Sequence, residues 1–274
     1  MKNELRIVLQ AVRKSLDDQV NDLAAAIAYW ALFSIFPLLI GALSLAGYFL
    51  DSVEVQTRIY ELVTDLLPGS ADLVKKSLVS VVRYRGSMGL IGILMLLWTA
   101  SKGLAAVTRA VNRALGTERP HSYVVSKLRF FAMTAAVTVL VVVSIAIVVA
   151  IEIFFQPSFL ARLGLTQIDI SRVQGWLVSF LFVFCMFALI YRMTPYIKVR
   201  WRQILPGALF AAILFEMGKV GFVVYLERAA GLEAIYGSLS SILVLLLWLY
   251  LSALVLVYGA EYNIVRWQFR QQTD

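Results

Sequence analysis

The sequence predicts an all-α, polytopic membrane protein with six transmembrane helices, and its composition is the main reason. Hydrophobic residues make up 61% of the 274 residues, against about 45–50% in ordinary soluble domains. Charged residues make up only 15%, against about 25%, and the mean hydropathy is +0.81. The apolar residues also gather in long, nearly charge-free runs. A soluble globule of this length could not bury so much apolar surface, and the same composition excludes a disordered chain.

Six of the apolar runs are long enough to cross a bilayer, for which a helix needs about 20 residues. Their ends are marked by charged residues, because a charge at the bilayer centre costs about 3 kcal/mol. The second run passes Lys102, and the fifth contains Glu216 and Lys219. We therefore expect residues 1–274 to form a single membrane domain. Its spans lie at about 23–50, 86–107, 130–151, 173–191, 204–226 and 236–260.

Lysine and arginine residues are unevenly distributed between the two sides of the predicted bundle. With six spans, both termini lie on one side, and the loops and tails of that side carry 15 Lys and Arg residues against 8 on the other. Cytoplasmic loops carry the excess of positive charge in membrane proteins. We therefore expect the N- and C-termini to be cytoplasmic.

Two segments outside the spans have the periodicity of amphipathic helices. In the first outer loop, residues 51–85, Pro68 and Gly69 separate two helical runs, and Ser70 can cap the second. These two short helices would rest in the outer interface or fold back over the bundle as a lid, although a simple packed connector fits equally well. The N-terminal tail has an apolar stripe that predicts a helix on the cytoplasmic surface. The stripe consists of Leu5, Val8, Leu9, Val12 and Leu16.

Four stretches of the sequence resemble the YihY/BrkB family of bacterial inner-membrane proteins. They read AAAIAYWALFSIFPLLIGALSLAGYFL at 24–50, LLWTASKGLAAVTRAVNRA at 96–114, TPYIKVRWRQILPGALFAAILFEMGKVGFVVYL at 194–226 and YGSLSSILVLLLWLYLSALVLVYGAEYN at 236–263. The ordered set covers nearly the whole chain, while the third and fourth spans share only hydrophobicity with the family. The resemblance implies a multi-pass protein of the bacterial inner (plasma) membrane with six spans and cytoplasmic termini.

The same resemblance implies little biochemistry. Some members of the family carry the label "ribonuclease BN", and others carry a virulence or serum-resistance label. Neither label brings a set of catalytic residues that maps onto positions in this chain. The question of enzyme activity therefore rests on the residues themselves.

The chemistry-bearing residues argue against an enzyme. His121 is the only histidine and Cys185 the only cysteine, so a zinc hydrolase with several His and Asp ligands has no ligand set. The acidic group Asp17, Asp18 and Asp22 is ordinary for the first turn of a helix. P-loop and G-x-S-x-G motifs are absent, which excludes ATP-driven transport by this chain alone. We expect no enzyme, cofactor or metal, with a ribonuclease as the least favoured alternative.

The ionisable residues inside the predicted spans are the best candidates for a functional site. Deep charges are costly and usually face a partner or a wet cavity. We expect an intramembrane polar site made of Lys102, Glu216, Lys219 and Glu261. Glu216 and Lys219 are three residues apart and can pair on one helix face. Lys102 either extends to the interface or meets Glu261, because spans two and six place these residues in the same leaflet.

Two prolines interrupt the predicted spans. Pro37 lies near the middle of span one and is a candidate helix kink, with Ser34 placed to satisfy the freed backbone. Broken helices are where transporters place their sites, although a simple kink is the commoner case. Pro206, followed by Gly207, is expected to begin span five, where proline is harmless.

Two functions remain open from the sequence. We expect the protein to bind or translocate a lipid-like or amphipathic substrate of the cell envelope, with membrane lipid as its partner. The net charge of +8 then indicates contact with anionic headgroups and not with nucleic acid. The alternative is a non-transporting scaffold for a protein partner. A wet cavity reaching Glu216 and Lys219 would favour transport, whereas a dry core with these two paired only to each other would favour the scaffold.

Overall fold

The computed structural model describes residues 10–11, 13–14, 19–49, 89–117, 128, 132–133, 170–228 and 236–271. Within these ranges all regular structure is helical, as predicted. The long helices are α2 (Val20–Phe49), α5 (Gly89–Ala114), α8 (Ile170–Met193), α9 (Trp201–Arg228) and α11 (Ser240–Gln271). A 3₁₀ turn, η1 (Gly237–Leu239), precedes α11.

These helices correspond to the predicted spans one, two, four, five and six. In the described part of the chain, three segments are long and apolar enough to cross a membrane, namely Trp176–Met193, Trp201–Arg228 and Ser240–Phe269. A further apolar segment in α2, Val20–Ser34, is shorter. The predicted third span, the two outer helices and most of the N-terminal helix lie outside the described residues. Six spans therefore stay a prediction.

Two helices continue beyond the predicted ends of their spans. The prediction ended span two at residue 107 and span six at residue 260, whereas α5 ends at Ala114 and α11 at Gln271. The charge that follows span six does not end the helix, because Glu261 is fully buried by tertiary packing. At 1.5 Å per residue, the 32 residues of α11 extend about 48 Å, more than the roughly 30 Å of a hydrocarbon core.

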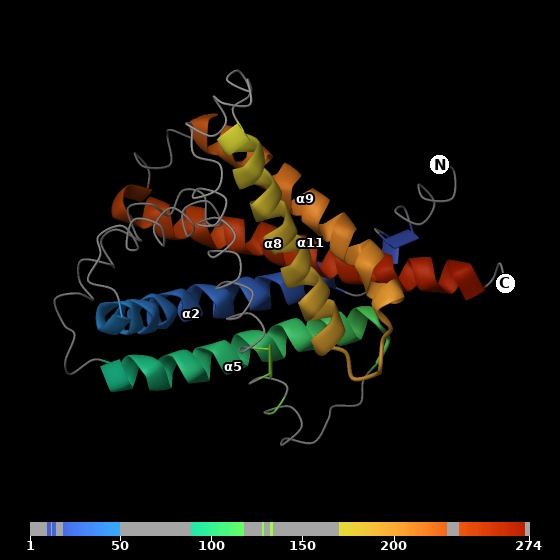
Figure 1. The fold of residues 1–274 in the computed structure, drawn as a ribbon, viewed down its shortest axis with the longest axis horizontal. Helices are drawn as coiled ribbons and strands as arrows, with labels where there is room; N and C mark the ends of the chain where they lie inside the picture. The colour runs from blue at the N-terminus through green and yellow to red at the C-terminus, as the bar shows by residue number, and fades with distance from the viewer. Residues whose placement is uncertain are drawn as a thin grey trace, which may run out of the picture.

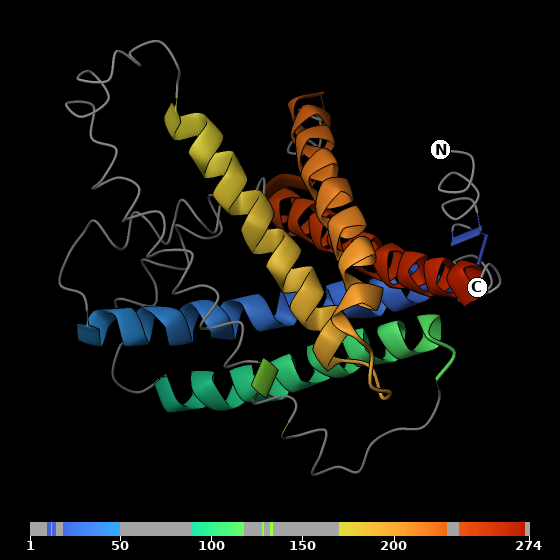
Figure 2. The same ribbon diagram turned by 45° about the vertical axis from the view of Figure 1, so that its right-hand side comes forward.

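The five helices meet at one end of the molecule, which we call the convergent end. Helices α2 and α9 begin there, α5 and α8 end there, and the C-terminal half of α11 passes through it (Figure 1). Helix α2 packs along α5, α11 packs against both α2 and α9, and α8 packs against α9. Away from the convergent end, α8 and α9 diverge from the pair α2 and α5 (Figure 2).

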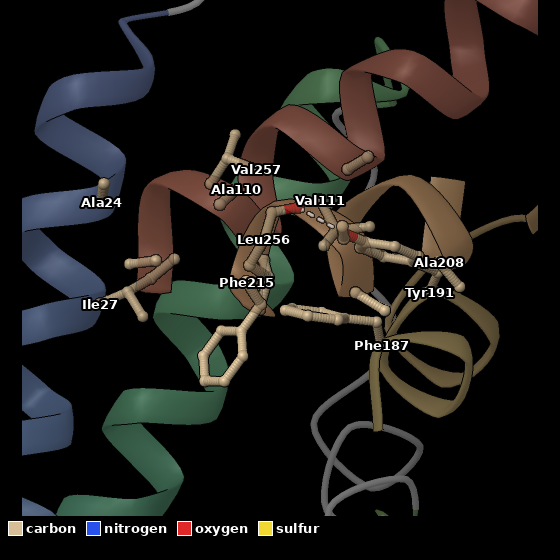
Figure 3. Close-up of a cluster of buried hydrophobic side chains, with 14 of the residues drawn as sticks. Ala24, Ile27, Ala110, Val111, Phe187, Tyr191, Ala208, Phe215, Leu256 and Val257 are labelled. Atoms are coloured by element: carbon tan, nitrogen blue, oxygen red, sulfur yellow. Dashed lines mark hydrogen bonds between the residues drawn. The ribbon is translucent and has the colours of Figure 1, made fainter. Parts of the chain in front are cut away.

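One cluster of buried apolar side chains occupies the convergent end (Figure 3). The Tyr191 hydroxyl lies inside it and donates a hydrogen bond of 2.6 Å to the carbonyl oxygen of Leu256, so that this buried polar group is satisfied. The cluster therefore joins all five helices. Its members include Ala24 of α2, Val111 of α5, Tyr191 of α8, Ala208 of α9 and Val257 of α11.

Helices α9 and α11 approach closely because small residues lie at their crossing. A Cβ atom on Gly207 would overlap the Asn263 side chain, and one on Gly259 would overlap the Tyr191 hydroxyl. Ala211, one turn after Gly207 on α9, is fully buried and lies against Gly259 of α11. In membranes, small residues at the interface let two helix backbones pack tightly. This crossing fixes α9 against α11 at the convergent end.

Helix α5 ends in a Schellman motif, which sets the geometry of the convergent end. Gly116 has φ +63°, a conformation that glycine adopts without a steric penalty. Its N–H donates to the carbonyl of Arg113, and the N–H of Thr117 donates to the carbonyl of Asn112, both at 2.9 Å. This is the hydrogen-bond pattern that satisfies the last carbonyls of a helix.

Candidate functional site

Ser179, Glu216 and Lys219 form a buried cluster between α8 and α9, which we call the α8–α9 polar cluster. Glu216 Oε2 lies 3.2 Å from Lys219 Nζ, and the two side chains are only 8% and 14% exposed. The Ser179 hydroxyl donates to Glu216 Oε1 at 3.3 Å, and Lys219 Nζ donates to Ser179 Oγ at 3.2 Å. The predicted pairing of Glu216 with Lys219 on one helix face is confirmed.

The third member of this cluster, Ser179, was not predicted. Serine is common in apolar helices, and its role depends on how α8 packs on α9, which no pattern in either helix reveals. Ser179 bonds to both charged groups, so Glu216 and Lys219 are not paired only to each other. The cluster offers a carboxylate and an ammonium within one turn of α9 and a hydroxyl from α8, a set that can bind a charged group but contains no general base of the histidine type.

Glu261 lies elsewhere, at the convergent end, and pairs with the N-terminal segment. Its Oε2 atom is 2.7 Å from Lys14 Nζ, and the side chain is 0% exposed. Lys14 also donates to the carbonyl oxygen of Ala114 at 2.8 Å, one of the carbonyls that the end of a helix leaves without an intrahelical partner. Residues 10–11 and 13–14 are helical, and Ala11 packs against Tyr262 of α11.

Of the two alternatives that the sequence left open for Lys102, the meeting with Glu261 does not occur. Lys102 lies twelve residues before Ala114 on α5, about 18 Å along the helix axis, and its side chain is exposed. Lys14 contacts both Ala114 and Glu261, so it occupies the position that the prediction gave to Lys102. Shared depth in the bilayer was the reason for the prediction, and the actual partner comes from a segment outside the spans.

The four predicted residues therefore occupy three places and do not form one site. Gly207 contacts Asn263 at the convergent end, and Glu216 follows nine residues later on α9, about 13 Å along the axis. Glu216 and Lys219 are consequently remote from Glu261. Within the described ranges, no three His, Cys, Asp or Glu side chains gather as a metal site would require.

Pro206 lies inside α9 and not at its start, which corrects the sequence-based placement. Helix α9 begins at Trp201, so proline in its second turn removes a backbone donor and crowds the preceding turn. The next residue bonds to α11, because the N–H of Gly207 donates to Asn263 Oδ1 at 2.7 Å. This bond joins the disturbed turn of α9 to α11, while the carbonyl that Pro206 frees is that of Arg202.

In α2, the backbone continues as a helix beyond the position of Pro37. The Ser34 hydroxyl donates to the carbonyl oxygen of Trp30 at 2.7 Å. It therefore does not serve the carbonyl of Phe33, which is the one that a proline at position 37 frees. The side chain of Pro37 lies outside the described residues, so its role as a kink stays a prediction.

A cavity of about 120 Å³ lies at the convergent end, well away from the α8–α9 polar cluster. It is enclosed by the end of α5, the loop between α8 and α9, the start of α9 and the C-terminal part of α11. Most of its wall is apolar, and its polar residues are Tyr191, Lys198, Gln203 and Asn263. The sequence did not predict this cavity.

The loop between α8 and α9 is held in place by Asn112 of α5. The Asn112 Nδ2 donates to the carbonyl of Thr194 at 3.0 Å, and its Oδ1 accepts from the N–H of Tyr196 at 2.7 Å. Asn112 is 2% exposed, so these bonds are made away from water. At the start of α9, the N–H of Arg200 donates to Gln203 Oε1 at 2.8 Å, the reciprocal half of a capping box.

Comparison with known proteins shows the family to which this chain belongs. The model of the family described as Virulence factor BrkB matches residues 11–274. The chain belongs to the BrkB family. This membership agrees with the resemblance inferred from the four stretches of sequence, and it makes the chain a membrane protein. No solved structure matches the chain.

Several relatives in the BrkB family align over most of this chain. The ribonuclease-like protein YfkH of Bacillus subtilis (strain 168) is 30% identical over 243 residues, which cover 88% of this chain and 87% of YfkH. The UPF0761 membrane protein PSHAa0171 of Pseudoalteromonas translucida is 27% identical, with 92% and 83% covered. The UPF0761 membrane protein NTHI0384 of Haemophilus influenzae is 28% identical, with 89% of each chain covered. The two UPF0761 names describe membrane proteins and state no enzymatic activity, and the ribonuclease-like name is that of YfkH.

Proposed function

We propose that this BrkB-family protein crosses the bacterial inner membrane six times with both termini in the cytoplasm. The directions of the helices support this topology. Helices α5 and α8 both end at the convergent end, so residue 170 at the start of α8 lies at the opposite end from residue 114. An odd number of crossings between these residues fits one further span. The basic residues of the convergent end, such as Arg113, Lys198 and Arg200, support its placement on the cytoplasmic side.

Within this topology, the function we propose is the binding or translocation of a lipid-like or amphipathic substrate of the envelope. The observation that carries the proposal is the α8–α9 polar cluster. Two opposite charges lie near the middle of α9, bonded to a hydroxyl from α8, where apolar residues would be the less costly choice. Ionisable groups within membrane spans are rare and often mark substrate or ion pathways.

The geometry of the cluster suggests how a substrate would bind. Ser179 comes from α8, whereas Glu216 and Lys219 come from α9, so a separation of the two helices would break the bonds to Ser179 and leave the Glu216–Lys219 pair on one helix. A phosphate group could then take the place of the hydroxyl beside Lys219. The exposed apolar side chains along α8, such as Trp176, Leu177 and Leu181, would accompany the acyl part of the same molecule.

Bound lipid in the purified protein tests this proposal. Native mass spectrometry of the full chain in detergent should detect retained lipid-like molecules, and Glu216→Leu/Lys219→Met should lose one of them. The matched control is Met217→Leu/Val220→Leu, which changes two exposed residues of the same helix turn (both 65% exposed) and should retain the wild-type set. Equal retention by the two double variants would refute the proposed site.

One observation favours the alternative, a non-transporting scaffold. The three members of the cluster also satisfy one another, and a pair closed in this way can serve only to fix α8 against α9. The same experiment separates the two functions. A scaffold would show the same retained lipids in wild type and Glu216→Leu/Lys219→Met, with only its thermal stability changed.

A further inference from the structure

We propose that the cavity at the convergent end is a second binding site, which holds the phosphate headgroup of an anionic membrane lipid. This inference concerns a site separate from the α8–α9 polar cluster, and it does not depend on what that cluster binds. It rests on the size of the cavity, the chemistry of its wall, the local charge and the rigidity of the loop that forms it.

The size of the cavity fits a headgroup better than a whole lipid. Its volume of about 120 Å³ equals the liquid volume of about four water molecules. A phosphate ester with part of its alcohol has that size, whereas the acyl chains must lie outside. The cavity is partly open, so a molecule held there by its head can extend its tails along the helices.

The wall of the cavity combines apolar surface with a few polar groups. Lys198 supplies a cation, and Gln203 and Asn263 supply carboxamides. Apolar side chains make up the greater part of the wall, among them Val111, Ile204 and Ile264. Ligand sites of small amphiphiles have this composition, in which a small number of polar groups orient a largely apolar contact.

The charge around the cavity favours an anion. Among the described residues that line it, there is no Asp or Glu. The nearest acidic residue along α11, Glu261, points its Oε2 at Lys14 with an ion-pair distance of 2.7 Å. Arg200 and Arg202 are exposed beside Lys198, so the mouth of the cavity is positive. Each basic residue near a membrane surface contributes about 1 kcal/mol to the attraction of anionic lipid.

The position of the cavity fits the level of lipid headgroups. Trp267 lines the cavity and is 40% exposed, and Trp201 at the start of α9 is 48% exposed. Tryptophan gathers at the membrane–water interface, where its ring is apolar and its N–H can reach water. The cavity therefore lies where the phosphates of one leaflet lie and not in the hydrocarbon core.

The loop that carries Lys198 is held in a defined conformation before any ligand binds. Asn112 binds this loop at Thr194 and Tyr196, and Arg192 donates to the carbonyl of Val199 at 2.6 Å. A preformed site loses less conformational entropy when it binds. The loop is thus suited to selecting a headgroup and not merely to attracting anionic lipid by charge.

The test compares lipid retention by the full chain in phosphatidylglycerol and in phosphatidylcholine nanodiscs. After extraction into detergent, wild type should retain phosphatidylglycerol in preference to phosphatidylcholine. Lys198→Gln should reduce that preference about fivefold, the effect of one basic residue at an anionic surface. Ile197→Trp should remove it without changing charge, because Ile197 lines the cavity and is 49% exposed, so a larger ring can fill the mouth without disturbing the core.

Two controls keep this test decisive. Arg228→Gln removes an exposed charge at the other end of α9, and Glu216→Leu/Lys219→Met alters the other site; both should keep the preference for phosphatidylglycerol. Equal effects of Lys198→Gln and Arg228→Gln, or an unchanged preference in Ile197→Trp, would overturn the proposal. Loss of the preference in Glu216→Leu/Lys219→Met would also overturn it, because the two sites would then be one. Displacement of the lipid by inorganic phosphate alone would indicate a site for free phosphate instead.

Discussion

Lys14 and Glu261, which are 247 positions apart in the chain, form an ion pair of 2.7 Å at the convergent end. Through this pair the N-terminal segment is joined to α11, and through the carbonyl of Ala114 it is joined to α5. Glu261 is completely buried, so the pair is made away from water. Ala11 and Lys14 are therefore packed against the bundle.

The first prediction concerns the strength of this pair. Lys14→Met should lower the free energy of unfolding by about 3 kcal/mol, because it leaves a buried carboxylate without its cation. The estimate is at the low end of the range for broken buried pairs, since Lys14 is 30% exposed. Thermal unfolding in detergent measures the change. Arg13→Met, at the exposed neighbouring position, should change stability by less than about 0.5 kcal/mol.

The double variant Lys14→Met/Glu261→Leu completes this comparison. Replacing both members of a buried ion pair with apolar groups is often neutral, so the double variant should be close to wild type in stability. A double variant as unstable as Lys14→Met would show that the pair itself, and not the unpaired charge, carries the stabilisation.

The second prediction concerns the crossing of α9 and α11. Gly207→Ala should destabilise the protein by about 2 kcal/mol, because its methyl group would overlap the Asn263 side chain. Gly218→Ala, on the same helix, meets nothing within 4 Å and should stabilise by about 0.5–1 kcal/mol through helix propensity. The unfolding midpoints of the two variants should thus shift in opposite directions. Shifts of the same sign would contradict the close contact.

The third prediction concerns the loop between α8 and α9. Asn112→Ala should destabilise the protein by about 3 kcal/mol, since it removes the bonds to Thr194 and Tyr196 and leaves buried backbone groups unsatisfied. Limited proteolysis should detect faster cleavage within residues 194–200. Arg113→Ala, at the adjacent exposed position, should leave the cleavage rate unchanged. Equal cleavage of the two variants would mean that Asn112 does not hold the loop.

The fourth prediction is the topology. Reporter fusions after Thr117 and after Arg200 should report the cytoplasm. Thr117 follows α5 and Arg200 follows α8, and both helices end at the convergent end. A fusion after Gly69, in the predicted outer loop, should report the opposite side. A reporter at Thr117 that reads the outer side would overturn the count of six spans.

Patterns within a single helix could be predicted from the sequence, and contacts between distant segments could not. The apolar runs predicted five helices that the structure describes, and the three-residue spacing of Glu216 and Lys219 predicted their pairing. Lys14 could not be matched to Glu261, because its position on a short helix near the N-terminus carries no information about α11. The full length of α11 was missed for the same reason, since only tertiary packing explains why a buried Glu261 continues the helix.

The polar residues with structural roles were the hardest to predict. Ser179, Asn112 and Asn263 are single polar residues within helical stretches, a context in which many such residues simply face solvent or bond to their own backbone. Each of them acts across a helix interface. Ser179 bonds to α9, Asn112 bonds to the loop between α8 and α9, and Asn263 bonds to the turn of α9 that contains Pro206. None of these partners is adjacent in sequence.

The most direct test of the central claim is complementation of the gene deletion by Glu216→Leu/Lys219→Met, with membrane abundance measured alongside. The deletion strain is scored for sensitivity to envelope stress. If the α8–α9 polar cluster handles a substrate, the double variant should reach wild-type abundance in the membrane and fail to restore resistance. Full complementation at normal abundance would contradict the claim, because it would leave Glu216 and Lys219 with no role beyond packing.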